Sequence, residues 1–150
     1  MVFKVGRMKT LKLLIIGLLF AQLGFAQKGD LSELEFVANV DGVKEMTQNE
    51  VVNVFRNGRS LWDKGQKVII VLPSNNSPMA ETVATNLYRG SVSSMQKFWL
   101  ALVFQGRSNP PVFLQTPEEM INYIKNNPGS IGVLPKGSVQ IPGNLELIVK

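Results

Sequence analysis

The sequence contains neither cysteine nor histidine. Without cysteine the chain forms no disulfide, has no thiol nucleophile and offers no thiol for lipid attachment. Without histidine it lacks the side chain that most often serves as a general base and most often binds transition metals. These two absences argue against an enzyme and against a metal or other cofactor.

Adjacent carboxylates, which acid–base catalysis often requires, are almost missing as well. Glu118 and Glu119 form the only such pair. Both follow Thr116 and Pro117 at an expected helix start, where Glu119 completes a cap and Glu118 favours the helix dipole. A structural role is therefore sufficient for the pair.

No apolar run reaches the roughly 20 residues that a membrane-spanning helix needs. The apolar run at 13–20 follows four basic residues and precedes the small residues Gly24 and Ala26. This order predicts a signal peptide over residues 1–26, with cleavage after Ala26 and no membrane-spanning segment in the mature form. Met8 also begins a sufficient signal, so either Met1 or Met8 is the start. We expect a periplasmic or secreted protein.

Strong charge of either sign is absent once the signal peptide is removed. Cleavage removes four of the 16 basic residues and none of the 11 acidic ones, which leaves a net charge of +1. No arginine-rich stripe with interleaved aromatic residues remains, so nucleic-acid binding is not expected. Residues 27–150 have the usual length of one domain.

Hydrophobic periodicity and turn signals predict alternating strands and helices. The expected strands span 35–40, 68–72, 112–114, 131–134 and 145–149. Four helices are expected between them: one capped by Thr47 and ended by Gly58, one capped by Ser77 and ended by Gly90, one from Ser93 or Ser94, and one capped by Thr116. This order predicts an α/β domain with a mixed sheet of about four to five strands flanked by about four helices.

The segment after the second expected strand is the best place for a ligand. Ser77 precedes Pro78 at an expected helix start, and the first amides of that helix, from Met79, lack partners within the helix. A helix N-terminus after a strand favours an oxyanion, and Asn76 and Thr82 would add neutral donors. The alternative is that Ser77 is only a cap.

Several segments, in this order, resemble the phosphate-type substrate-binding proteins of ABC transporters, which are type II periplasmic binding proteins. The similar segments are 47–55, Gly58 and Trp62, 68–77, Phe98 and Trp99, 104–107 and 127–133. The resemblance implies one lobe of the two-lobed fold, phosphate as the ligand of the serine-containing loop, and an ABC permease or a second, lobe-supplying subunit as partner. The charged residues of that loop in the family are replaced near 73–75, so Arg107 is the compensating cation we consider.

We therefore expect an exported solute-binding-like protein that binds phosphate or a similar oxyanion through Asn76, Ser77, Met79, Thr82 and Arg107. The alternative is an envelope interaction module that keeps the fold and has lost ligand binding. The stripe of Met95, Phe98, Trp99, Leu102 and Val103 is expected to face the core of the domain.

Overall fold

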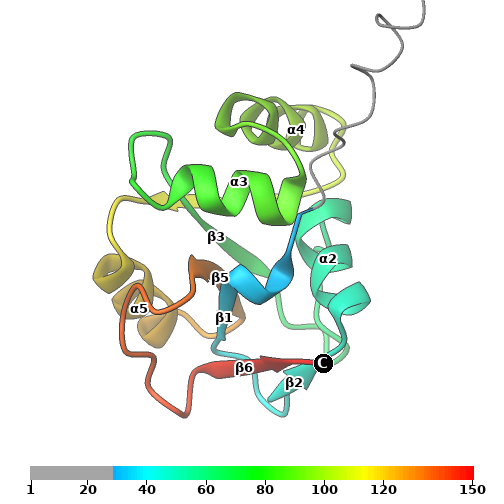
Figure 1. Cartoon of the computed structure of the whole chain (residues 1–150). Helices are drawn as coiled ribbons and strands as arrows, with labels where there is room; N and C mark the ends of the chain where they lie inside the picture. Colours follow the sequence, from blue (N-terminus) through cyan, green and yellow to red (C-terminus); the bar gives the residue numbers. More distant parts are fainter. Residues whose placement is uncertain (1–28) are drawn as a thin grey trace, which may run out of the picture.

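The computed structural model describes residues 29–150, and the predicted signal peptide lies outside this part of the chain. The elements follow one another in the order η1 (Leu31–Glu33), β1 (Leu34–Ala38), β2 (Glu45–Met46), α2 (Gln48–Asn57), β3 (Ile69–Pro73), α3 (Ala80–Tyr88), α4 (Val92–Phe104), β4 (Val112–Leu114), α5 (Pro117–Asn126), β5 (Ser130–Pro135) and β6 (Glu146–Val149) (Figure 1).

The strands form one mixed sheet in the order β2-β6-β1-β5-β3-β4. Strands β5, β3 and β4 are mutually parallel, whereas β1 runs antiparallel to both β5 and β6. The α/β fold with a mixed sheet, expected from the sequence, is confirmed. The sheet has six strands rather than four or five, because β2 has only two residues and is too short for an alternating pattern.

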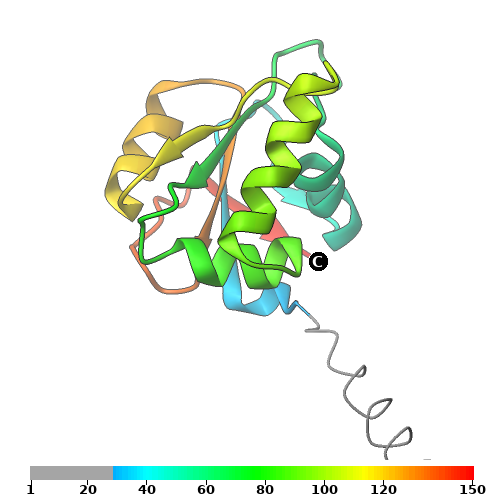
Figure 2. The ribbon, with the colours of Figure 1, turned by 90° about the horizontal axis from the view of Figure 1, so that it is seen from above.

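Helices cover both faces of the sheet, with α2, α3 and α4 on one side and α5 on the other (Figure 2). Neighbouring strand residues alternate between the two faces. Phe36 and Leu72 pack against the three helices, whereas Val37 and Val71 pack towards α5. The central strands are therefore buried on both sides, as the continuous apolar run of 68–72 predicted.

Both predicted capping boxes form. The Thr47 hydroxyl accepts from the Glu50 amide, and the Glu50 carboxylate accepts from the Thr47 amide. The Thr47 backbone amide and, to a smaller extent, the Thr47 hydroxyl (2.8 Å) donate to the Glu50 carboxylate, and this holds the pKa of Glu50 below its usual value. Thr116 and Glu119 make the same reciprocal pair at the start of α5.

Boundaries of α3 and α4 differ from those expected. Helix α4 is capped by Ser91 and begins at Val92, because the Ser91 hydroxyl accepts from the Ser94 amide (3.2 Å). Helix α3 ends at Tyr88, two residues before Gly90, with Arg89 in the left-handed conformation (φ 56°). The expected stripe on α4 is only partly enclosed: Met95, Trp99 and Leu102 are buried, and Phe98 and Val103 are half-buried.

Candidate functional site

The carboxyl ends of β5, β3 and β4 meet at one edge of the sheet because these strands are parallel. Three loops leave this edge: 74–79 to α3, 115–116 to α5, and 136–145 after β5. Ligands of open α/β sheets bind where such loops and helix N-termini come together. The residues of these loops are therefore the first place to look for a binding site.

Ser77 ties two of these loops together. Its hydroxyl donates to the Gln115 carbonyl oxygen (2.8 Å) and accepts from the Met79 amide (3.2 Å), and the residue is buried. The expected helix-capping role of Ser77 was wrong, because α3 begins only at Ala80. The chain makes a tight turn first, in which the Ala80 amide donates to the Ser77 carbonyl oxygen (3.0 Å).

The structure brings four of the five expected ligand residues to this edge, but the hydrogen-bonding groups of some are already occupied. Asn76 is exposed at the tip of the turn. The amide of Met79 already donates to Ser77, and the Met79 side chain is buried against the α5 side of the sheet. Thr82 lies in the first turn of α3, half-buried. Ser77 and Met79 would have to give up existing hydrogen bonds to contact an anion.

The N-terminus of α3 still offers unpaired donors. Within residues 29–150, the amides of Glu81 and Thr82 have no hydrogen-bond acceptor, and no side chain caps the helix. The N-terminus of α5 differs, because the Glu119 carboxylate accepts from the amides of Gln115 (2.9 Å) and Thr116 (3.3 Å). Of these two helix starts, the one at α3 has no side-chain cap and the one at α5 has a complete capping box.

Two serine hydroxyls at the same edge of the sheet were not expected from the sequence. The hydroxyl oxygens of Ser74, directly after β3, and Ser138, after β5, are both buried, and neither has a hydrogen-bond partner in the described part of the chain. Continuing the β3–β5 register sets Ser74 beside Pro135, whose carbonyl oxygen accepts from the Ser138 amide (3.2 Å). Buried hydroxyls normally have a partner, so these two suggest a missing polar group.

Arg107 lies elsewhere. It follows α4 and precedes β4, so it is at the amino ends of the parallel strands, opposite the loop that contains Ser77. The neighbouring Ser108 packs against Gly58, which also precedes β3. The cation at the carboxyl edge is instead Lys136, exposed directly after β5. The structure therefore separates Arg107 from the other expected ligand residues.

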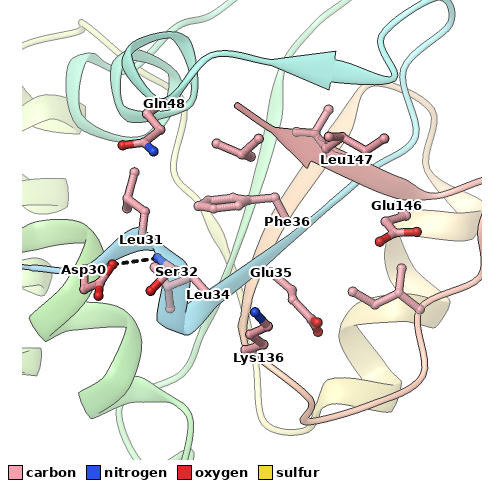
Figure 3. Close-up of a pocket in the computed structure, with 13 residues that line it drawn as sticks. Asp30, Leu31, Ser32, Leu34, Glu35, Phe36, Gln48, Lys136, Glu146 and Leu147 are labelled. Atoms are coloured by element: carbon pink, nitrogen blue, oxygen red, sulfur yellow. Dashed lines mark hydrogen bonds between the residues drawn. The ribbon is translucent and has the colours of Figure 1, made fainter.

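Three surface grooves are found in the described part of the chain, and none of them is lined by Asn76, Ser77, Met79 or Thr82. One, of about 400 Å³, has Phe36 and Leu147 among its apolar walls. Carboxylates of Glu35 and Glu146 lie along it together with the Lys136 ammonium (Figure 3). This excess of carboxylates does not suit an anion. Residues 29–150 contain no cluster of three or more metal-ligating side chains.

The sequence matches no protein-family model. It also has no significant match among curated proteins. Among solved structures, the fold is similar to PstS from Borrelia burgdorferi (TM-score 0.51, 17% identity, 79% of this chain and 47% of that chain). It also matches an ABC-type phosphate transport receptor from Vibrio cholerae (TM-score 0.45, 15% identity, 77% of this chain and 45% of that chain).

The chain spans just under half the length of these two structures. At 17% identity, the likeness to PstS shows a common fold. The sheet and its helices thus have the periplasmic-binding-protein-like fold that the resemblance of the sequence implied. Among residues 29–150, every helix is too short or too polar to cross a membrane.

Proposed function

We propose that this chain is an exported, solute-binding-like protein that binds phosphate or a similar oxyanion in connection with ABC-type uptake. The observation that carries the proposal is the pair of buried, unpartnered hydroxyls of Ser74 and Ser138 at the edge where the N-terminus of α3 is open. Hydroxyl and amide donors of this kind satisfy the oxygens of a tetrahedral anion without a formal charge.

The anion would take the open amides of Glu81 and Thr82 together with the two hydroxyls. Asn76 and the Thr82 side chain lie at the same edge and would add donors. Lys136 supplies a positive charge after β5, whereas the exposed Glu81 carboxylate in the first turn of α3 opposes an anion there. We therefore propose that this chain alone binds the anion weakly, and that a second wall of the binding site completes the contacts.

The second wall would come from a partner. We propose a lobe-supplying subunit for this wall and an ABC permease as the further partner, as the resemblance of the sequence implied. The periplasmic or secreted location rests on the predicted signal peptide. Mass spectrometry of the exported protein should find Gln27 at the N-terminus, and retention of residues 13–20 would mean a membrane anchor instead.

The second candidate function is an envelope interaction module that has lost ligand binding. The occupied hydroxyl of Ser77 and the occupied amide of Met79 favour it, because both groups are committed to holding the loop. The two functions differ in one measurable respect, since only the first predicts a bound anion.

Calorimetric titration of residues 27–150 with phosphate, sulfate and molybdate tests the proposal. We expect heat of binding with at least one anion, and its loss in the double variant Ser74→Ala/Ser138→Ala. That variant should fold at least as stably as the original, because it removes two unsatisfied buried hydroxyls. The control is Ser93→Ala, at an exposed hydroxyl on α4. Absence of heat with every anion would support the interaction module.

A further inference from the structure

A second groove lies between α2 and the end of α3, with a volume of about 470 Å³. One wall is the face of α2 that carries Asn49, Val52 and Arg56, and the other includes Leu87 and Arg89. Val52 and Leu87 make part of the wall apolar. The Tyr88 hydroxyl donates to the Phe55 carbonyl oxygen (3.3 Å), which fixes the end of α3 against the last turn of α2.

The two arginines of this groove have no charged partner. Neither guanidinium forms an ion pair or a hydrogen bond with any group of residues 29–150. Arg56 is half-buried and Arg89 is exposed. Asp30 also lines the groove, and its carboxylate accepts from the Ser32 amide (2.9 Å). Two cations against one carboxylate leave the groove with an excess of positive charge.

The backbone of Arg89 is a second, independent observation. Arg89 is the only residue other than glycine with a positive φ among residues 29–150. This left-handed conformation is unfavourable for a side chain with a Cβ, and helices usually end there with glycine. Arginine therefore occupies a position where glycine would be more stable, and such outliers cluster at ligand-binding sites.

We propose that this groove binds a small organic anion, with its carboxylate or phosphate group between Arg56 and Arg89 and its apolar part on Val52 and Leu87. Guanidinium groups bind both kinds of oxyanion through paired hydrogen bonds. The site is distinct from the carboxyl edge of the sheet, because the length of α3, about 12 Å, separates them. It does not depend on the function proposed above.

The test uses residues 27–150 with hexanoate and hexyl phosphate, measured by calorimetry and thermal shift. We expect at least one of them to bind with one-to-one stoichiometry, and hexylammonium not to bind. Arg89→Gly should keep or raise the melting temperature, because glycine suits the left-handed position. The same variant, and Arg56→Gln, should weaken the binding on the order of tenfold or more.

The matched control is Lys97→Ala, which removes an exposed cation from α4 and should leave the affinity unchanged. The double variant Ser74→Ala/Ser138→Ala should also leave it unchanged, which separates this site from the anion site proposed above. Binding of neither anion by the unaltered protein would overturn the proposal. The proposal would also be overturned if Arg56→Gln and Arg89→Gly bound the anions as tightly as the unaltered protein does. Binding of hexylammonium as tight as that of the anions would overturn it too.

Discussion

The hydroxyl of Ser77 donates to the carbonyl oxygen of Gln115 across 38 residues of sequence, at a distance of 2.8 Å. This bond joins the loop after β3 to the loop after β4, at the edge where we place the anion. Ser77 therefore holds the loops of the candidate site together rather than capping the start of α3.

Substitution of Ser77 separates these two roles. Ser77→Ala and Ser77→Gly both remove the bond to Gln115 and leave the buried Met79 amide without an acceptor. We expect each to lower the free energy of unfolding by about 1–3 kcal/mol, measured by urea denaturation. A helix cap would behave differently, because glycine replaces a capping serine at a cost of only a few tenths. Near-normal stability of Ser77→Gly would contradict a stabilising role for the bond between Ser77 and Gln115.

Helix α4 offers a matched pair of leucines on opposite faces. Leu102 is 5% exposed and Leu100 is 58% exposed. Leu102→Ala should lower the free energy of unfolding by about 2–5 kcal/mol, because it leaves a cavity in the core. Leu100→Ala should change it by about 0.5 kcal/mol or less. Equal losses in the two variants, measured by urea denaturation, would mean that α4 packs differently.

Tyr88 links α3 to α4, and its ionisation should lower the stability of the fold at alkaline pH. Its hydroxyl accepts from the Trp99 indole nitrogen (2.8 Å). Burial raises the pKa of the Tyr88 phenol above its usual value of about 10. A group with a raised pKa in the folded state stabilises below its unfolded pKa, and this contribution is lost as pH rises past about 10.

We therefore expect urea midpoints to fall between about pH 9 and pH 11 more steeply for the unaltered protein than for Tyr88→Phe. The difference between the two proteins isolates Tyr88 from the lysines and from Tyr123. At neutral pH, Tyr88→Phe should be less stable, because the Trp99 N–H loses its acceptor. Parallel midpoint curves across this pH range would contradict a buried hydroxyl.

The fold could be predicted from local patterns because its elements carry their own signals. Thr47 with Glu50, and Thr116 with Glu119, specify helix starts within four residues, and the structure has both boxes. Apolar runs similarly placed β3 and β5 to within one residue. Strand β2 carries no such signal, since its two residues are ordered by pairing with β6 and by the burial of Met46 in the core.

The candidate site was harder to predict, because it depends on contacts between distant segments. Ser77 was expected to be a cap from its neighbour Pro78, yet its partner Gln115 lies on another loop. Ser138 follows no motif, and its unpartnered hydroxyl is recognised only once β5 is placed next to β3. Arg107 was considered for its charge alone, and only the strand directions show it to be at the opposite edge.

The most direct test of the anion site is a phosphate titration of residues 27–150, in which amide chemical shifts are measured in assigned ¹⁵N–¹H NMR spectra. We expect the largest shifts at Glu81 and Thr82, whose amides are unpaired at the start of α3. Glu118, at the start of α5 where Glu119 forms the cap, is the internal control. Saturating phosphate that moves Glu81 and Thr82 no more than Glu118 would contradict an anion site at this edge.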